Sequence, residues 1–403
     1  MANMSGHKGA LDGIRVLDLT RVLAGPFCTM LLGDMGAEII KIEMPGSGDD
    51  SRRYPPFIGE ESAYFMNLNR NKKSIVLDLK LPEAKEIFLR LVEKSDVILE
   101  NFRPGTMEKL GVGYETIKAR NPDIVYSCIS GFGHSGPYKD LPGYDIIGQA
   151  MGGIMSITGW PDSPPTRTGT AIGDVLAGLN ACVGILAGLL SVRNGGRGQK
   201  VDIALVDSVV SAMETIIQIY LVENRIPQRT GNRYEFIYPY DTFKARDGWV
   251  IIAVGNNKLW EVFCNAIHRP DLLKDPKYKD NYDRVKAHEE VKQIVEGWTE
   301  TREVKEIVDF FLSKKIPCAP IFSVKEVVED EHIANSRRMI REIEHPVAGS
   351  VKVIGSPVNL SETPPEVHSP APLLGQHTES VLLGILGLTP AEISSLKEEK
   401  AFG

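Results

Sequence analysis

The sequence predicts a mixed α/β protein with a parallel sheet and more than one domain. Strand-like apolar segments alternate with helix-like segments through the first half of the chain, and such alternation predicts parallel strands joined by covering helices. A second, shorter alternation begins after residues 227–233, where we place a domain boundary. The length of 403 residues agrees with about two or three domains. The 42% hydrophobic and 25% charged residues are typical of a soluble globular protein.

The first half of the chain predicts a large domain, residues 1–226. Its strands are expected at residues 13–19, 37–43, 74–79, 96–100 and 123–129, and its helices at 26–33 and 82–94. The strands carry apolar side chains on both faces, which a sheet covered on both sides requires.

Residues 175–192 form a long apolar segment with Asn180 as the one polar residue before its closing Ser191-Val192. Its length is enough to cross a membrane. The segment is rich in Gly and Ala and two amphipathic domains flank it, so we expect a fully buried core helix and no membrane partner. A turn at 195–199, a strand at 200–205 and a helix at 206–223 are expected to follow.

The second half predicts a smaller α/β domain, residues 227–330, and a C-terminal segment, residues 331–403, that returns to the large domain. The small domain is expected to contain a strand at 249–254, a helix at 259–267, a charged helical region at 278–299, a helix at 304–315 and an exit segment at 321–329. The C-terminal segment is expected to contain a strand at 351–354, an extended Pro-rich strap at 361–372 and a helix from Thr378.

Charge and cysteine content exclude several classes of function. The net charge of −7 disfavours nucleic acid, because phosphate binding needs a basic surface. The five cysteines are scattered and never form a C-x-x-C pair, which indicates reduced thiols in a cytoplasmic protein. The eight histidines lack the spacing of metal ligands, so no metal site is expected. Residues 1–9 lack the apolar core of a signal peptide.

Asp174 is the most informative residue of the chain. It follows a Gly- and Thr-rich run at 166–173 and opens the long apolar segment, which places a carboxylate at the mouth of the predicted core helix. One hypothesis makes Asp174 a helix N-cap, whose side-chain oxygen accepts a backbone N–H of the first turn. The other makes it a carboxylate nucleophile in a dry site. The rest of the sequence favours the second hypothesis.

A G-x-G-x-x-G motif at residues 131–136 invites a dinucleotide-binding interpretation. That motif requires a helix directly after it, so that a pyrophosphate can lie at the helix N-terminus. Pro137 and Pro142 follow instead and block a regular helix. We therefore predict no NAD site, and we interpret residues 131–136 as a glycine loop that lines an active site.

Seven motifs, in order and spacing, resemble the class III CoA-transferase family, which includes formyl-CoA and carnitine CoA-transferases. They are LDLTRVLAGP at 17–26, IKIE at 40–43 with GSGD at 46–49, NKKSI at 71–75, ENFRPG at 100–105, GTAIGD at 169–174, GRGQ at 196–199 and PLLGQHT at 372–378. The resemblance covers nearly the whole chain. It implies a Rossmann-like large domain, a smaller α/β domain, and an interlocked homodimer in which each chain threads through a ring made by the other.

The resemblance also implies a reaction. In the family the Asp after Ile-Gly is the nucleophile, which here is Asp174. Its carboxylate is expected to attack the thioester of an acyl-CoA, and CoA then moves to a carboxylic acid through aspartyl anhydride and aspartyl-CoA thioester intermediates. Coenzyme A and acyl-CoA are substrates, and no tightly bound cofactor is expected. Water must be excluded from these intermediates, and backbone N–H groups can stabilise the oxyanion of each tetrahedral step.

CoA-binding residues are carried over from the same resemblance. Val22, Leu23 and Ala24 are expected beside the pantetheine, and Leu77 and Lys80, with Asp78 and Leu79, near the nucleotide. Asn101, Phe102 and Arg103 are expected beside the adenine and pyrophosphate. Lys109 replaces a family Arg that contacts phosphate, which keeps the charge and loses the bidentate geometry. Tyr144 and Asp145 are expected close to the reacting centre.

The chain departs from the formyl-CoA transferase type at several positions. Leu23 stands where that type has Gln, and Met44 where it has Arg. Residues 231–234 stand where that type has a polyglycine loop. These changes favour a larger or more apolar acyl group than formate or oxalate. Arg21, Arg167 and Arg233 are candidates to hold a second carboxylate of the substrate.

Two alternative functions remain open at this point. An α-methylacyl-CoA racemase shares the fold and needs a His–Asp pair on opposite faces of the α-carbon. Its His precedes Asp-Ile, whereas this chain has Tyr144 there, and a Tyr with a pKa of about 10 is a poor base at neutral pH. His134 is then the only substitute nearby. The second alternative is a non-catalytic CoA-binding subunit, which the presence of Asp174 disfavours.

Overall fold

The computed structural model describes residues 9–398, and the chain divides into two compact units. Of the described residues, the large unit comprises 9–154, 167–217 and 330–398, and the small unit comprises 155–166 and 218–329. The first eight residues, where the sequence predicted no signal peptide, lie outside the described part.

A six-stranded sheet forms the centre of the large unit, and every neighbouring pair of its strands is parallel. The strands are β1 (Arg15–Asp18), β2 (Glu38–Glu43), β5 (Lys72–Val76), β6 (Val97–Glu100), β7 (Val125–Ser130) and β8 (Lys200–Ala204). Their order is β5-β2-β1-β6-β7-β8. The predicted parallel sheet is confirmed. The first strand, β1, lies in the middle of the sheet. The chain adds β2 and β5 on one side of β1, and then β6, β7 and β8 on the other side. The order of strands therefore reverses direction between β1 and β6, and ligands bind at such a point in sheets of this kind.

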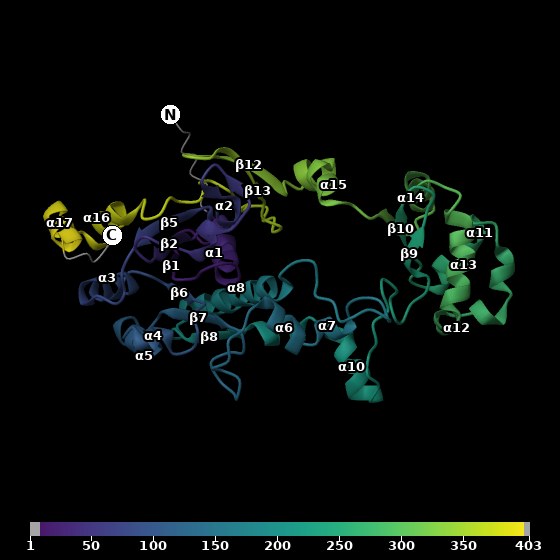
Figure 1. The fold of residues 1–403 in the computed structure, drawn as a ribbon, viewed down its shortest axis with the longest axis horizontal. Coiled ribbons are helices and arrows are strands. Elements are labelled where there is room, and N and C mark those ends of the chain that lie inside the picture. The colour runs from purple at the N-terminus through teal and green to yellow at the C-terminus, as the bar shows by residue number, and fades with distance from the viewer. Residues whose placement is uncertain (1–8, 399–403) are drawn as a thin grey trace. The chain divides into compact units, whose positions relative to one another are not determined.

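Helices cover both faces of this sheet (Figure 1). One face packs against α1 (Ala24–Asp34) and α8 (Ile172–Arg193), and the buried residues between them form one hydrophobic cluster. The opposite face packs against α3 (Pro82–Val92), α5 (Tyr114–Arg120), α16 (Thr378–Leu386) and α17 (Pro390–Glu398), which share a second cluster. The expected helices at 26–33 and 82–94 therefore correspond to α1 and α3.

The strands of this sheet are not apolar throughout, which corrects the sequence analysis. Asp18, Lys41 and Lys72 are buried on β1, β2 and β5. The Lys72 ammonium lies 3.0 Å from the Asp18 carboxylate, and the Lys41 ammonium lies 2.9 Å from Asp49. Burial would raise the pKa of Asp18, but Lys72 and Lys41 outweigh it and hold that pKa well below its usual range. Paired charges of this kind are tolerated in a core, whereas single ones are not.

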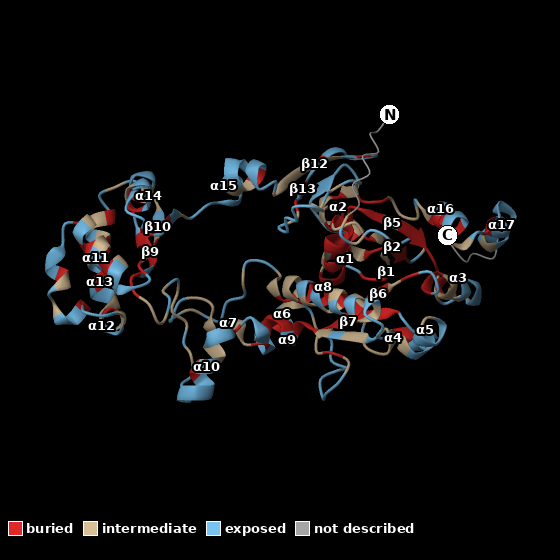
Figure 2. Cartoon of the chain, turned by 180° about the vertical axis from the view of Figure 1, so that it is seen from behind, coloured by how far each residue is buried: buried red, intermediate tan, exposed pale blue. Residues whose placement is uncertain are grey.

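Helix α8 is only partly buried in the single chain, so the prediction of a fully buried helix is wrong. One face, which includes Gly178, Ala181 and Ile185, packs against the sheet and α1. Leu179 and Val183 on the other face are 40% and 66% exposed, and Figure 2 shows the pale exposed turns along α8. By length and composition the helix passes as a membrane span, with 33% of its apolar window buried.

The predicted helix at 206–223 is broken in the structure. Helix α9 (Leu205–Ser211) and helix α10 (Glu214–Glu223) are bent by 76° relative to one another. Glu214 has a φ of 20° at the break, a backbone conformation that an ordinary helix residue avoids. The apolar sequence through this region contains no Gly or Pro that would have signalled the bend.

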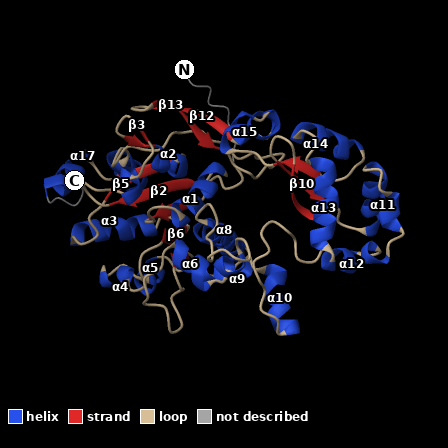
Figure 3. Cartoon of the chain, turned by 45° about the vertical axis from the view of Figure 1, so that its right-hand side comes forward, coloured by secondary structure: helices blue, strands red, loops and turns tan. Residues whose placement is uncertain are grey.

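The small unit contains a three-stranded antiparallel sheet and several helices (Figure 3). Its elements are β9 (Tyr240–Lys244), β10 (Trp249–Ala253), β11 (Cys318–Pro320), α11 (Asn257–Ala266), α12 (Asn281–Lys286), α13 (His288–Thr299), α14 (Val304–Ser313) and α15 (Val324–Glu329). Strand β10 and helices α11 and α14 match the expected elements. Strands β9 and β11 were not predicted.

The remaining elements of the large unit are short and mostly lie in its connections. They are β3 (Phe57–Ile58), β4 (Glu61–Ser62), α2 (Ala63–Asn69), α4 (Thr106–Lys109), α6 (Asp145–Met151), β12 (Ile340–His345) and β13 (Gly349–Ile354). Helix α7 (Ile154–Ile157) lies at the boundary between the units. The C-terminal segment contacts strand β5, where the His377 amide donates to the Ser74 carbonyl at 2.9 Å.

Candidate active site

A cavity of about 360 Å³ lies where the winding of the sheet reverses, and we call it cavity A. Its walls come from the segments that follow β1 and β6, from the end of β7 with Gly131, from residues 141–144, and from Asp174. A second cavity of about 240 Å³, cavity B, lies over the ends of β1, β2, β5 and β6. Arg21 and Phe102 line both, so the two cavities share a wall.

The structure brings most of the predicted site residues together. Those that line cavity A are Val22, Leu23, Ala24, Asn101, Phe102, Arg103, Tyr144 and Asp174. Those that line cavity B are Leu77, Lys80 and Phe102, with Asp78 and Leu79. Lys109 lines neither cavity and is exposed on α4, although its neighbours Thr106 and Leu110 line cavity B. Asp145 lines neither cavity.

Asp145 caps the helix that carries Asp174. Its Oδ1 accepts the N–H of Gly173 at 2.8 Å and that of Asp174 at 3.3 Å, and the Gln149 amide donates to its Oδ2 at 2.7 Å. Asp174 is the third residue of α8, after the N-cap Ala171, so the N-cap hypothesis for Asp174 is wrong. The capping carboxylate comes from a residue 29 positions earlier, a distance that the local sequence pattern does not reveal.

The Asp174 carboxylate is held in an unusual electrostatic state. Burial, and then the nearby Asp145 carboxylate, raise the pKa of Asp174 to about 7. Within residues 9–398 no side chain or backbone group donates a hydrogen bond to the Asp174 carboxylate. Tyr64 is close enough that burial and the Asp174 charge together raise the pKa of Tyr64 to about 12. An unpaired, partly desolvated carboxylate is a reactive nucleophile.

The raised pKa of Asp174 should make the stability of the protein depend on pH. Because the pKa of Asp174 is raised in the folded protein, its contribution to stability is present at low pH and is lost as pH rises through about 7. We expect Asp174→Asn to be more stable than the wild type at about pH 8, by on the order of 2–3 kcal/mol for a partly accessible group. The difference should shrink by more than half at about pH 5 and vanish only below the ordinary pKa of 3.8, where the carboxyl is protonated in the folded and the unfolded protein alike. Urea unfolding at both pH values, with mass spectrometry to exclude deamidation, measures it. Equal stability of the two proteins at the higher pH would contradict the raised pKa.

Close packing of α1 on α8 brings a helix N-terminus next to Asp174. A Cβ added to Gly178 would lie 2.6 Å from the Ala24 carbonyl oxygen, so the first turn of α1 contacts α8 one turn after Asp174. Leu23 provides no side-chain cap for α1. Pro26 has no N–H and the Phe27 N–H donates to the Leu23 carbonyl at 2.8 Å, so the amides of the first turn without an i−4 carbonyl partner are those of Ala24 and Gly25. Such amides favour negative charge on a nearby atom.

The segment from Thr20 to Leu23 is clamped in a strained conformation. Val22 has a φ of 68°, which is unfavourable for a β-branched residue. Its N–H donates to Asp49 Oδ1 at 3.1 Å, and Lys41 Nζ binds Asp49 Oδ2 at 2.9 Å and the Thr20 carbonyl at 2.7 Å. Strained backbone held by its surroundings is common at functional sites.

Asn101 also holds this segment in place. Its amide oxygen accepts the Arg21 N–H at 2.9 Å and its amide nitrogen donates to the Arg21 carbonyl at 2.8 Å. Lys41 and Asp49 belong to the IKIE and GSGD motifs, but these motifs did not predict a role for either residue. The missing signal was their ion pair, which joins a residue of β2 to one in the loop that follows it.

Comparison with known proteins identifies relatives of the whole chain. The model of "CoA-transferase family III" matches residues 11–378. A succinyl-CoA:mesaconate CoA-transferase of Haloarcula hispanica is 43% identical over 93% of this chain and 96% of its own length. A succinyl-CoA:glutarate CoA-transferase of Mus musculus is 40% identical over 96% of this chain and 88% of its own length. A CAIB/BAIF family protein from Brucella suis has a similar solved structure, with a TM-score of 0.82 and 34% identity over 94% of this chain and all of that one.

Proposed function

This chain belongs to CoA-transferase family III and transfers CoA between an acyl-CoA and a carboxylic acid, and we propose that Asp174 is the nucleophile of that reaction. The observation that carries the proposal is the unpaired Asp174 carboxylate on the wall of cavity A, with its pKa raised to about 7. Within the family this position follows Ile-Gly, as it does here.

The proposed reaction proceeds by four acyl exchanges without net redox change or proton loss. An Asp174 oxygen attacks the thioester carbonyl, the C–S bond breaks, and CoA thiolate leaves with the electron pair, which gives a mixed anhydride. The thiolate attacks the aspartyl carbonyl of the anhydride and releases the first acid. The acceptor carboxylate then attacks the aspartyl-CoA thioester and forms a second anhydride. The thiolate finally attacks the new acyl carbonyl, which releases the product thioester and the free Asp174 carboxylate.

The surrounding residues support these steps. The free amides at the N-terminus of α1 offer donors for the oxyanion of each tetrahedral intermediate. Val22, Leu23 and Ala24 form the wall of cavity A along which the pantetheine would lie. Cavity B, with Leu77 and Lys80 in its lining, is the proposed nucleotide site. Lys109, exposed beside it on α4, is the more distant phosphate candidate.

We further propose that both acids are small dicarboxylates and that succinyl-CoA is the donor. The curated relatives named above are succinyl-CoA transferases with mesaconate or glutarate as partner, and a Chloroflexus aurantiacus relative, 38% identical, is named for D-citramalate. Arg21 and Arg103 line cavity A and supply positive charge for the distal carboxylate. Arg167 donates to the Thr168 carbonyl, and Arg233 belongs to the small unit.

A screen of acids tests the substrate class. The purified protein is incubated with succinyl-CoA and glutarate, mesaconate, citramalate, malate, oxalate or matched monocarboxylates such as butyrate, and products are identified by mass spectrometry. Dicarboxyl-CoA products are expected, with little turnover of the monocarboxylates. Transfer to monocarboxylates alone would contradict the dicarboxylate assignment. Deuterium exchange at the α-carbon without exchange of CoA would support the racemase alternative instead.

A second copy of this chain is the proposed partner of the exposed face of α8. Leu179, Val183 and Leu190 lie on that face and are 40%, 66% and 58% exposed, and Leu221 and Val222 of α10 are also exposed. Apolar helix faces of this kind are typical of obligate interfaces. The family resemblance implies the interlocked homodimer. Light scattering after gel filtration should give the mass of a dimer, and Val183→Asp should yield monomer or aggregate. A monomeric wild type would contradict the proposal.

A further inference from the structure

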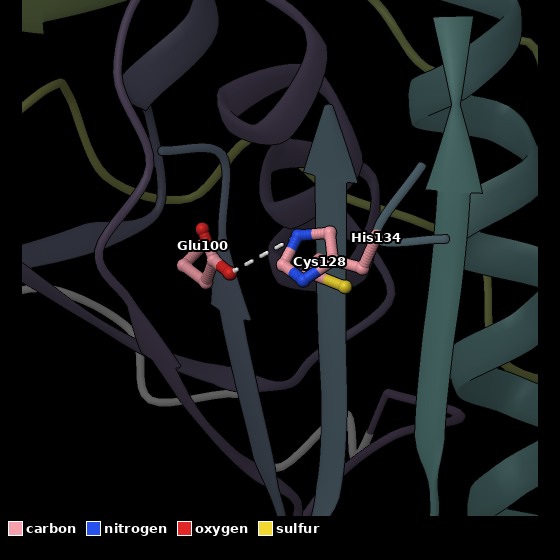
Figure 4. A group of neighbouring side chains, drawn as sticks. All are labelled: Glu100, Cys128 and His134. Atoms are coloured by element: carbon pink, nitrogen blue, oxygen red, sulfur yellow. Dashed lines mark ion pairs between the residues drawn. The ribbon is translucent and has the colours of Figure 1, made fainter. Parts of the chain in front are cut away.

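Three side chains of the metal-binding types meet beneath cavity A, and we call them the Glu100 cluster. Glu100 ends β6, Cys128 lies on β7, and His134 lies in the glycine loop 131–136. Their ligand-type atoms all lie within 4.8 Å of one another, and His134 Nε2 is 3.9 Å from Glu100 Oε1 (Figure 4). Glu100 and Cys128 are buried, and the His134 side chain is 11% exposed. Within residues 9–398, the buried His134 Nε2 atom has no hydrogen-bond partner.

The contacts of His134 argue against a metal at this place. Lys200 Nζ lies 3.0 Å from His134 Nδ1. An ammonium group only donates, so Nδ1 accepts and Nε2 carries the ring proton. Burial and the Lys200 charge lower the pKa of His134, which keeps the ring neutral. Burial also raises the pKa of the Cys128 thiol. His134 therefore directs its buried Nε2–H toward the Glu100 carboxyl group. It has no lone pair on Nε2 that could bind a cation.

The two residues of this contact adjoin two segments that line cavity A. Glu100 Oε2 accepts the Phe102 N–H at 2.8 Å, which orients the segment 101–103. The backbone N–H of His134 donates to the Asp202 carboxylate at 3.1 and 3.0 Å, which anchors the glycine loop to β8. Gly131 of that loop lines cavity A, as do Asn101, Phe102 and Arg103. A bond between His134 and Glu100 would join the two walls.

We propose that His134 is a positioning residue for CoA, which donates its Nε2–H to Glu100 when CoA binds and so fixes the segment 101–103 against the glycine loop. The proposal rests on the proposed function, because it assigns CoA to the wall formed by residues 101–103. It requires the donor and acceptor atoms to approach from 3.9 Å to about 2.9 Å, the ordinary length of such a bond.

The ionisation of Glu100 makes this contact sensitive to pH. Burial raises the pKa of Glu100 to about 7, and the Phe102 N–H and the Tyr126 hydroxyl partly oppose that shift. A protonated Glu100 would direct an O–H or a weaker acceptor at an N–H group, so the bond requires the carboxylate. The other titratable groups that face Glu100 are Tyr126, whose hydroxyl lies at 3.2 Å, Glu108, Cys128 and Lys200. CoA affinity should therefore increase as pH rises through about 7.

Calorimetric titration of the full-length protein with free CoA tests the proposal. The Asp174→Ala background removes Asp174, whose pKa is also raised to about 7. His134→Leu should weaken CoA binding roughly tenfold, the size of one hydrogen bond to a charged group. His134→Gln, which keeps a side-chain N–H donor, should restore most of that loss. In the otherwise wild-type enzyme, His134→Leu should raise KM for acyl-CoA and leave kcat within about twofold.

The pH dependence of CoA binding provides the second measurement. Between about pH 6 and about pH 8, binding should tighten in the protein with Glu100 and stay constant in Glu100→Gln, which cannot ionise. Unchanged CoA affinity in His134→Leu, or equal defects in His134→Leu and His134→Gln, would overturn the proposal. So would one equivalent of zinc bound by the wild type and lost in His134→Leu. A protein that binds no CoA at any pH would contradict the proposed function itself.

Discussion

Asp174→Ala is expected to abolish turnover while leaving CoA binding intact. Removal of a covalent nucleophile typically lowers kcat by a factor on the order of 10⁴ or more. The walls expected to hold CoA come from the segments after β1, β5 and β6, none of which includes Asp174. The dissociation constant for CoA should therefore remain within about threefold of the wild-type value. Steady-state kinetics and calorimetry on the same preparation separate the two effects.

Asp207→Ala is the matched control for this change. Asp207 is the third residue of α9, as Asp174 is the third residue of α8, and both are acidic groups in a first helical turn. Asp207 is exposed and lines neither cavity, so its removal should change kcat by less than about twofold.

Trapping of the covalent intermediate tests the same role directly. Incubation with acyl-CoA, followed by hydroxylamine and peptide mass spectrometry, should mark the peptide that contains Asp174 and leave the one with Asp207 unmarked. Full activity in Asp174→Ala would refute the assignment of the nucleophile. An acyl adduct on another peptide would refute it equally.

Lys41→Met is expected to cause the largest loss of stability. Burial alone would lower the pKa of Lys41, but Asp49 and Asp18 outweigh it and raise that pKa, so the ammonium is a stable charge between two buried carboxylates. Removal of one partner from a buried ion pair costs about 3–5 kcal/mol, because the remaining charge stays unpaired. The change also removes the donor to the Thr20 carbonyl, which should release the strained segment at Val22 and lower activity as well.

Lys73→Met is the control for Lys41→Met, because it removes a lysine from the same sheet without breaking a buried ion pair. Lys73 lies on β5, next to β2, which carries Lys41. Its side chain is 46% exposed and pairs with Glu38 at 2.6 Å. Exposed pairs contribute about 0–1 kcal/mol, so Lys73→Met should unfold in urea close to the wild type. Equal midpoints for Lys41→Met and the wild type would show that the buried pair does not stabilise the fold.

Local sequence patterns predicted the positions of the strands better than the charged residues that are buried in them. The apolar segments around Val16, Ile39 and Ile98 identified three strands because strand length and spacing are local properties. The burial of Asp18 and Lys72 was not predicted, because a charge is tolerated in the core only when it is paired. The two partners of this pair lie 54 residues apart in the sequence. The bend at Glu214 was missed because no turn-forming residue marks it.

For the candidate site, the sequence predicted the residues that belong to its motifs but not the contacts between them. Asp174 and the segments 22–24 and 101–103 were named from the resemblance to the family, and the structure places all of them on cavity A. Asp145 was named as well, but its function as the cap of α8 was not. The Glu100–His134 contact joins residues 34 positions apart, one from a strand and one from a loop, and no spacing rule connects them.

The sequence by itself determined the alternation of strands and helices, the resemblance to one family and the identity of the candidate nucleophile. Each of these three properties depends on the residue types at neighbouring positions, which can be read from the sequence. Only the tertiary structure decided that the Asp174 carboxylate accepts no hydrogen bond from residues 9–398, that Lys41 holds Val22 in place through Asp49, and which face of α8 is exposed. Those properties arise because parallel strands bring their carboxyl ends to one edge of the sheet, where residues far apart in the chain share one dry environment.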